Sequence, residues 1–167
     1  MKPIYHTDHA SPLGPLRLEY SEGRLTGLWL PTGIHAQTAA ASGLRDDRVF
    51  DEIRRQLDAY FLGRRRRFDV PLRGVGTVFQ ETVWAALAAI PYGDTWSYGH
   101  LAAQIGRPTT SRAVGAANGQ NPISILVPCH RVIGANGTLT GYGGGLPAKR
   151  WLLELERTGI PPEPPAQ

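Results

Sequence analysis

The chain has 167 residues, 41% of them hydrophobic, which is enough apolar material for one domain or two small ones. No run approaches the roughly 18 consecutive apolar residues that a membrane helix needs, and the first residues lack the apolar core of a secretory signal, so we expect a cytoplasmic protein without a membrane segment. The net charge of +4 permits a polyanionic partner but does not identify one.

Charge is distributed unevenly along the chain. Between Thr95 and Leu153 there is no Asp or Glu, although basic residues are present. A surface built from this segment would not repel phosphate. The run from Arg64 to Arg67 is more conspicuous, but beside Gly63 we interpret it as a solvated linker rather than a nucleic-acid patch.

The first third of the chain predicts a small antiparallel sheet. Short apolar segments occur at Ile4 to Thr7, Leu16 to Tyr20 and Leu25 to Leu30. They are separated by turn sequences such as Ser21-Glu22-Gly23. We therefore expect three strands joined by tight turns.

A helix and a linker follow the predicted sheet. Apolar residues recur at helical spacing from Val49 to Phe61, and Gly63 ends the run. Phe68 to Gly76 contains too much proline and glycine for a regular element. We place a domain boundary there, with one domain over residues 1–75 and a second over 76–167.

The second domain opens with three predicted helices. Thr77 and Gln80 form a capping-box pattern ahead of a helix that reaches Ile90. Two short helices follow, over Tyr98 to Ile105 with Ser97 as cap and over Ser111 to Asn118 with Thr109 or Thr110 as cap. Two short helices joined by a tight turn are typical of DNA-binding proteins, but they also occur as plain packing units.

The rest of the chain predicts a winged helix. Ile123 to Val127 predicts a short strand, and Val132 to Tyr142 predicts a hairpin around Asn136-Gly137. Pro147 then opens a last helix. A hairpin placed after two short helices is the order found in winged-helix proteins.

Cys129 is the only cysteine, so it is either a small core residue or a nucleophile. Pro128 breaks the preceding strand, and we expect amide N–H groups of the following turn to lower the thiol pKa. His130 adds a base, but neighbours on an extended chain point to opposite sides, so a bridging water fits better than direct contact. The nearest following acids are Glu154 and Glu156, and a lone Glu on a helix is usually a solvated residue.

Metal and nucleotide cofactors are not expected. One cysteine and five scattered histidines match no zinc pattern. Gly141 to Gly145 lacks the lysine of a phosphate loop, so we interpret it as a close-approach loop lining a pocket. A cysteine hydrolase using Cys129 and His130 remains an alternative, but their adjacent positions give poor geometry for it.

Taken together, these features resemble the O6-alkylguanine-DNA alkyltransferases, also called methylated-DNA-protein-cysteine methyltransferases. The matching motifs occur in order along the second domain: Phe79-Gln80, Val83-Trp84, Ile90-Pro91-Tyr92-Gly93, Ser97-Tyr98, Arg112-Ala113-Val114-Gly115, Asn121-Pro122, Pro128-Cys129-His130-Arg131-Val132, Gly141-Tyr142, Leu152-Leu153 and Glu156. The first 70 or so residues match more loosely. The resemblance implies an α+β fold, with a small ribonuclease-H-like antiparallel sheet and helix followed by a winged helix-turn-helix alkyltransferase domain.

The resemblance also implies a function. The protein would transfer the alkyl group from O6-alkylguanine, and from O4-alkylthymine, in DNA irreversibly to its own Cys129 in a single turnover, without a cofactor. Its partner would be double-stranded DNA carrying the lesion, bound by a monomer that can act cooperatively on DNA. The alternative is a non-catalytic alkyltransferase-like protein that only binds the lesion, but that group lacks the cysteine that this chain has.

Residue roles follow from the same resemblance. His130 would take the thiol proton through a water, Glu156 would orient His130, and Asn121 would pin the active-site turn. Tyr98 would crowd the phosphate and donate a hydrogen bond to the leaving guanine, and Arg112 would fill the vacated base stack. Further DNA contacts are implied for Ser97, Thr110, Ser111, Ala113 and Gly115.

A base pocket is implied as well, formed by Val132, Asn118, Tyr142, Gly143 and Gly144. The carbonyls of Cys129 and Val132 would accept from the exocyclic amine of guanine, and Tyr142 with the Gly143 amide would close over the base. The chain departs from some relatives in two ways. It offers no cysteines for an amino-terminal zinc site, and Asn118 stands where some members have a larger apolar side chain.

Overall fold

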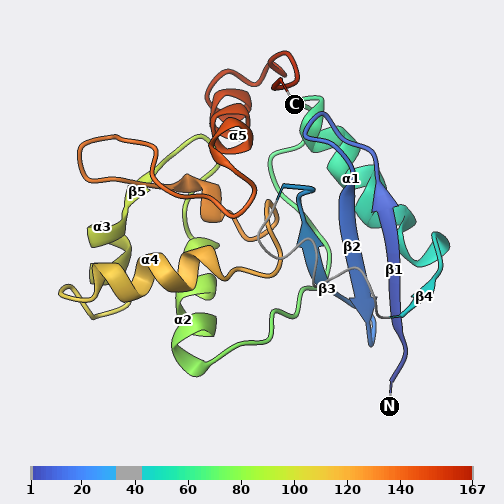
Figure 1. The fold of residues 1–167 in the computed structure, drawn as a ribbon, viewed down its shortest axis with the longest axis horizontal. Helices are drawn as coiled ribbons and strands as arrows, with labels where there is room; N and C mark the ends of the chain where they lie inside the picture. Colours follow the sequence, from blue (N-terminus) through green and yellow to red (C-terminus); the bar gives the residue numbers. More distant parts are fainter. Residues whose placement is uncertain (1, 33–42, 167) are drawn as a thin grey trace.

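The computed structural model describes residues 2–32 and 43–166. A sheet covered by helix α1 forms one side of the molecule, and helices α2, α3 and α4 form the other (Figure 1). The carboxy-terminal helix α5 packs into the core of the first side and contacts the 3₁₀ turn Cys129–Arg131. The expected α+β class is confirmed.

The sheet has four strands in the order β3-β2-β1-β4. The strands β1 (Ile4–His9), β2 (Leu16–Ser21) and β3 (Arg24–Trp29) are antiparallel, as the sequence predicts. Strand β4 (Leu44–Arg45) pairs parallel with β1 and was not predicted. Two residues are too few to show the alternation by which a strand is recognised.

The predicted turn between β2 and β3 is confirmed. Glu22 and Gly23 have φ angles of 54° and 78°. Two successive positive φ values suit a two-residue hairpin turn, whose twist matches that of the strands, and glycine adopts such a value without steric cost. Ser21 consequently pairs directly with Arg24.

Helix α1 (Asp51–Phe61) confirms the predicted helix, except that Arg48–Phe50 forms a 3₁₀ turn. One face of α1 is buried against the sheet. The aliphatic and aromatic residues of this first core within the amino-terminal half are Leu13, Leu16, Leu18, Leu25, Leu28, Leu30, Phe50, Ile53, Leu57, Tyr60 and Phe61. Burial of apolar surface stabilises such packing by about 25 cal/mol per Å², and this packing is what holds a helix of this length in place.

The predicted linker after α1 lies along the sheet edge. The Leu25 amide donates to the carbonyl of Pro71 at 2.9 Å, and the Arg73 amide donates to the carbonyl of Leu25 at 2.9 Å. Through these bonds the segment around Pro71 to Arg73 pairs with the free edge of β3. The connection between the two halves is therefore hydrogen-bonded to the sheet of the first half.

The helices of the second half largely confirm the sequence analysis. Helix α2 (Val78–Leu87) begins with the predicted capping box of Thr77 and Gln80. Helix α3 (Tyr98–Gln104) is capped by Ser97, whose hydroxyl accepts from the His100 amide at 3.0 Å.

Helix α4 (Ser111–Gly119) differs at its start. Thr110 occupies the cap position, but its hydroxyl donates to the Arg107 carbonyl at 2.7 Å and caps nothing. With φ −108° and ψ 31°, Thr110 is not in the extended conformation that a side-chain cap requires. The predicted cap is therefore wrong, although the helix itself is correct.

The predicted strand from Ile123 to Val127 is also wrong. Ile123 forms an isolated bridge to Leu28 of β3, and Ser124 forms another to Val127 within the same segment. Ile125, with a φ angle of 73°, reverses the chain between Ser124 and Val127, so no continuous strand forms.

The predicted hairpin is replaced by a turn and a different pairing. Strand β6 (Val132–Ile133) pairs parallel with β5 (Trp96–Ser97) rather than with the residues that follow it. The turn around Asn136-Gly137 is present, closed by a bond of 2.9 Å from the Gly134 amide to the Thr138 carbonyl. The partner of β6 thus lies 36 residues earlier, beyond the reach of local turn signals.

Helix α5 (Leu146–Thr158) begins with Pro147 in its first turn, as predicted. Its buried apolar side chains belong to the first core although they come from the second half of the chain. These are Ala148, Trp151, Leu152 and Leu155. Because α5 packs against α1 and the sheet, the next buried residue on it, Glu156, is brought to the junction of the two halves.

Candidate active site

Asn121 holds the segment that leads to Cys129. Its side-chain Nδ2 donates to the Val127 carbonyl at 2.8 Å, and its Oδ1 accepts from the Ile123 amide at 3.0 Å. Asn121 is buried, so these bonds are shielded from water. The structure therefore gives Asn121 the geometry of a residue that pins this turn.

Two successive three-residue turns deliver the cysteine. In the first, the Leu126 amide donates to the Ser124 carbonyl at 2.9 Å across Ile125, in a backbone region that β-branched residues rarely adopt. In the second, the Cys129 amide donates to the Val127 carbonyl at 2.8 Å across Pro128, whose angles of −82° and 63° suit this turn. Strain of this kind persists where surrounding contacts enforce it.

Cys129 begins a buried 3₁₀ turn, Cys129–Arg131, and is 4% exposed. Burial raises the pKa of the thiol, although hydrogen bonds from Asn121 and Ser124 and the charge of Lys149 oppose this effect. The expected lowering of the pKa by turn amides is thus wrong, because desolvation outweighs it. The thiol is protonated at neutral pH and needs a base.

The carboxylate of Glu156 gathers four hydrogen-bond donors. His130 Nε2 lies 2.8 Å from Oε1, and Tyr60 donates its hydroxyl to the same oxygen at 2.7 Å. Arg131 donates from Nε to Oε2 at 2.8 Å and from Nη2 to Oε1 at 2.9 Å. This bidentate geometry is the stronger form of an arginine–carboxylate pair.

The pKa shifts of Glu156 and His130 indicate which of the two groups is charged at neutral pH. Burial by itself raises the pKa of Glu156, but the attraction of His130 and hydrogen bonds from His130 and Arg131 outweigh it and hold this pKa far below its usual range. Burial lowers the pKa of His130 despite the opposing effect of Glu156. Glu156 is therefore ionised and His130 neutral at pH 7.

A neutral His130 has one free acceptor atom. An ionised carboxylate can only accept, so Nε2 carries the proton and Nδ1 does not. Nδ1 is buried and has no hydrogen-bond partner within residues 2–32 and 43–166. Cys129 and His130 lie on a 3₁₀ turn rather than the extended chain assumed from the sequence, and Nδ1 is the atom left to receive a proton.

Three residues of this site were missed by sequence analysis: Tyr60, Arg131 and Lys149. Arg131 follows His130 directly, but basic residues are usually solvated. Tyr60 belongs to the apolar face of α1 and gives no sign of a distant polar partner. Lys149 lies between buried residues of α5. Its place among apolar positions of the helix was the only sign in the sequence that its side chain is buried.

Lys149 is fully buried and holds two loops together. Its Nζ donates to the Val132 carbonyl at 2.6 Å and to the Thr140 carbonyl at 2.9 Å. Burial lowers its pKa to about 8, against the opposing effect of Cys129. The Val132 carbonyl, expected to accept from a base, is thus already engaged, although a carbonyl oxygen has a second lone pair.

Two buried polar atoms near Cys129 lack partners in the described part of the chain: Asn118 Oδ1 and the Tyr142 hydroxyl. Asn118 Nδ2 donates to the Cys129 carbonyl at 3.3 Å. Burial raises the pKa of Tyr142 well above its usual value, with a further contribution from Cys129. Unsatisfied buried groups cost about 1–3 kcal/mol each, so both atoms are suited to meeting the polar edge of a ligand. A methyl group at Gly143, beside Tyr142, would lie 3.8 Å from the Gly119 carbonyl.

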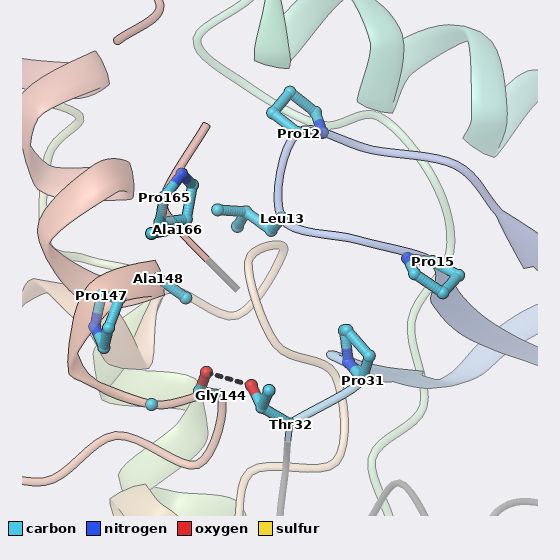
Figure 2. A pocket seen from close by; sticks show the side chains of 11 residues that line it. Pro12, Leu13, Pro15, Pro31, Thr32, Gly144, Pro147, Ala148, Pro165 and Ala166 are labelled. Atoms are coloured by element: carbon cyan, nitrogen blue, oxygen red, sulfur yellow. Dashed lines mark hydrogen bonds between the residues drawn. The ribbon is translucent and has the colours of Figure 1, made fainter. Parts of the chain in front are cut away.

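Gly144 lines a cavity that does not include Cys129. Its carbonyl accepts from the Thr32 hydroxyl at 2.6 Å (Figure 2). A side chain at Gly144 would meet Leu30. The cavity there has a volume of about 360 Å³ and is lined mainly by proline and other apolar residues, including Leu13 and Pro147. The structure thus connects Gly144 to the amino-terminal half.

The predicted DNA-binding residues lie on the surface of α3 and α4. Ser111, Arg112 and Ala113 are exposed on the first turn of α4. Tyr98, at the start of α3, is half-buried, and a methyl group at Gly115 would lie 3.6 Å from its ring. Arg112 and Tyr98 therefore belong to neighbouring helices of one helix-turn-helix unit. The hydroxyls of Ser97 and Thr110 are engaged in local bonds.

Two family models together cover nearly the whole chain. One, described as 6-O-methylguanine DNA methyltransferase, ribonuclease-like domain, matches residues 4–73. The other, described as 6-O-methylguanine DNA methyltransferase, DNA binding domain, matches residues 78–158.

Named relatives agree with these matches. The methylated-DNA–protein-cysteine methyltransferase of Mycobacterium tuberculosis is 50% identical over 158 residues, covering 95% of this chain and 95% of that protein. The chain belongs to the methylated-DNA–protein-cysteine methyltransferase family. The family member of Methanosarcina acetivorans is 49% identical over 153 residues, covering 92% of this chain and 98% of that protein.

A solved structure of the family shares the fold. The M. tuberculosis methyltransferase OGT, crystallised in complex with DNA, superposes with a TM-score of 0.87 at 50% identity, covering 96% of each chain.

Two further observations concern the described residues alone. Within residues 2–32 and 43–166, no helix is both long and apolar enough to span a membrane. The same residues contain no cluster of three or more His, Cys, Asp or Glu side chains that could hold a metal ion.

Proposed function

We propose that this protein repairs DNA by transferring the alkyl group of O6-alkylguanine, and of O4-alkylthymine, to the Sγ atom of its own Cys129. The observation that carries the proposal is that a chain of the protein-cysteine methyltransferase family has one cysteine, and that this cysteine lies in a buried turn next to a neutral histidine. No other sulfur nucleophile is available, because the remaining sulfur belongs to Met1.

The transfer balances as a single displacement. Sγ forms a bond to the alkyl carbon while the bond from that carbon to O6 breaks, and its electron pair stays with guanine. The thiol proton passes to Nδ1 of His130 through a water, and Tyr98 donates a hydrogen bond to the leaving guanine anion. Solvent then supplies one proton to the guanine ring, and His130 returns the thiol proton to solvent, so no net charge remains. The product is a thioether that water does not readily cleave, so each molecule acts once.

His130 suits the role of base because its environment keeps it neutral. Glu156 fixes the tautomer by accepting from Nε2, and Arg131 forms an ion pair with the same carboxylate. A base held in the correct tautomer contributes typically 10²- to 10⁴-fold to a proton transfer. Asn121 contributes by holding the turn on which the thiol lies.

Base extrusion follows from the burial of the thiol. Cys129 is 4% exposed, so an O6 substituent inside a duplex cannot reach it. Turning the nucleotide out costs a few kcal/mol, and less for a mispaired lesion. We assign Arg112 to fill the vacated stack, since it is exposed on the first turn of α4. Ser111, Ala113 and Gly115 lie along the same helix.

The extruded base would lie beside Cys129, against the residues of the predicted base pocket. Asn118 and Tyr142 offer the unpartnered polar atoms described above, and the Val132 carbonyl and Gly143 amide lie on the adjoining segments. In this role Asn118 also sets how large an alkyl group fits.

We further infer that the protein acts as a monomer in the cytoplasm. The residues assigned to the transfer all come from one chain, so no second copy is needed to complete the site. A buried free thiol is also suited to a reducing compartment. Cooperative binding along DNA is compatible with this arrangement and would appear as a steep binding isotherm on long duplexes.

Stoichiometry tests the proposal. Increasing amounts of a duplex containing O6-methylguanine are mixed with a fixed amount of protein, and repaired guanine is quantified. We expect repair to stop at one lesion per protein molecule, and Cys129→Ser to bind the duplex without repair. A protein that only binds lesions would repair nothing, and a cysteine hydrolase would turn over repeatedly; either result would refute the proposal.

A further inference from the structure

Tyr60 connects the amino-terminal half of the molecule to the carboxylate of the candidate active site. It lies on α1, 96 residues before Glu156, and its hydroxyl donates to Glu156 Oε1 at 2.7 Å. Tyr60 is 0% exposed and Glu156 is 4% exposed. The bond therefore lies in a water-excluded environment, where a hydrogen bond is electrostatically stronger than at the surface.

We propose that Tyr60 is a positioning residue of the transfer reaction, which holds Glu156 Oε1 from the amino-terminal half and thereby limits how strongly that carboxylate raises the basicity of His130. The inference rests on the proposed function, because it assigns His130 as the base. It goes further by making a residue of the ribonuclease-like half part of the transfer machinery.

Three donors compete for one carboxylate oxygen. Oε1 accepts from Tyr60, from His130 Nε2 and from Arg131 Nη2. Each donor withdraws electron density from the oxygen, so the bond from Tyr60 weakens the pull that Glu156 exerts on His130. Without the Tyr60 hydroxyl, Oε1 would stabilise a protonated His130 more strongly.

The groups around Glu156 come from several elements. Tyr60 approaches from α1, and His130 and Arg131 approach from the 3₁₀ turn. Tyr92, in the loop after α2, presents its ring to the Arg131 guanidinium at 5.8 Å. The charge of Lys149, on α5 itself, also acts to lower the pKa of His130. Among these groups, Tyr60 alone reaches the carboxylate from the amino-terminal half of the described chain.

Tyr60 can act only as a donor in this position. Burial raises its pKa well above the usual value, and the charge of Glu156 raises it further. The hydroxyl therefore stays protonated wherever the protein is folded. Tyr60 therefore keeps its proton over the pH range in which His130 gains or loses one, and it acts on the pKa of His130 through its bond to Glu156.

The ring of Tyr60 is held rigidly by other aromatic rings. Phe68 lies 5.2 Å away between ring centroids, Phe61 lies 5.5 Å away, and Tyr92 meets it edge-on at 6.3 Å. Such pairs are favourable in these tilted and edge-to-face geometries. Tyr60→Phe keeps this packing and removes only the hydroxyl, so it isolates the hydrogen bond to Glu156.

The test measures the rate of alkyl transfer from free O6-benzylguanine against pH, so that DNA binding does not enter. We expect Tyr60→Phe to move the acidic limb of the profile to higher pH by about half to one unit, the equivalent of one net hydrogen bond. A second variant carries 3-fluorotyrosine at position 60. Its more acidic phenol is a stronger donor, so the acidic limb should move to lower pH.

Tyr20→Phe is the matched control. Tyr20 lies in the same core, edge-on to Phe50, so the change removes a hydroxyl from the same half of the molecule without touching Glu156. Its profile should coincide with that of the unmodified protein.

The outcomes separate this inference from the function on which it rests. If the unmodified protein transfers the benzyl group and both Tyr60 variants reproduce its profile, or shift it in the same direction, Tyr60 has a structural role only and the inference is wrong. If the unmodified protein transfers nothing to Cys129, the proposed function itself fails. A His130 titration by NMR in Tyr60→Phe gives the same answer without relying on rates.

Discussion

At the scale of single residues, the buried cluster of His130, Arg131 and Glu156 is the most sensitive part of the molecule. Glu156→Gln removes the anion to which Arg131 donates twice. Breaking a buried ion pair on one side leaves an uncompensated charge, which typically costs about 3–5 kcal/mol. We expect a loss of that order in the free energy of unfolding by urea. Glu154→Gln, on the exposed side of the same helix, should change stability little; comparable losses in both variants would argue against the cluster.

The same cluster predicts how stability depends on pH. Glu156 has a folded-state pKa far below the ordinary value of 4.5, so its contribution is present above that value and is lost as the pH falls below it. His130 acts in the same direction, because its pKa is lowered from 6.5 in the folded state and the unfolded chain takes up the proton first. Urea denaturation from pH 7 to pH 3 should show falling stability. Glu156→Gln should show a shallower fall, and an unchanged slope would contradict the assignment.

The sequence allowed the residues of the candidate site to be predicted, but not the pKa shifts that the fold imposes on them. Cys129, His130, Asn121 and Glu156 could be named from motifs, and all four are buried, with His130 beside Glu156. The direction of the thiol pKa could not be predicted, because burial is a property of the folded core. Tyr60 was equally hidden, since its partner lies on another helix.

At the scale of elements, helices α3 and α4 carry a prediction about DNA. Arg112 is exposed on the first turn of α4, whereas Tyr98 lies half-buried at the start of α3. Arg112→Ala should slow repair of a duplex lesion and leave the reaction with free O6-benzylguanine nearly unchanged, since no base stack has to be filled. Tyr98→Phe should slow both, because in the proposed transfer Tyr98 also donates a hydrogen bond to the leaving base.

The rates are measured under single-turnover conditions with duplex and free base side by side. Arg150→Ala is the matched control, because Arg150 is exposed on α5 and the change removes the same charge outside the helix-turn-helix unit. Equal losses on both substrates for Arg112→Ala and Tyr98→Phe would contradict the separate roles.

Helices and strands could be predicted where the interactions that form them lie within a few residues along the chain. The capping box at Thr77 and the helical spacing along α1 act within a few residues, and both helices formed as expected. The strand over 123–127 and the hairpin over 132–142 failed because their partners are distant. Ile123 bridges to Leu28, and β6 pairs with β5. Short apolar runs do not specify which strand they will meet.

At the scale of the whole molecule, the first core joins both halves of the chain. It includes Trp151, Leu152 and Leu155 of α5 together with α1 and the sheet. Gly63, after α1, also approaches the Gly159 carbonyl at the end of α5 so closely that a side chain there would collide with it. The boundary near residue 75 remains a prediction about the chain, but the packing couples the two halves.

This coupling predicts cooperative unfolding. Scanning calorimetry should give a single transition whose van't Hoff and calorimetric enthalpies agree, as for a two-state protein. Two resolved transitions would show that the halves unfold independently. Such a result would also weaken the assignment of Tyr60 to the transfer machinery.

The fate of the Cys129 sulfur tests the account most directly. The protein is incubated with a duplex containing O6-methylguanine, and its intact mass and peptide map are then measured alongside the repaired DNA. We predict that the protein gains a single methyl group, located on Cys129, in proportion to the guanine restored. Restored guanine with an unmodified Cys129 would contradict the account.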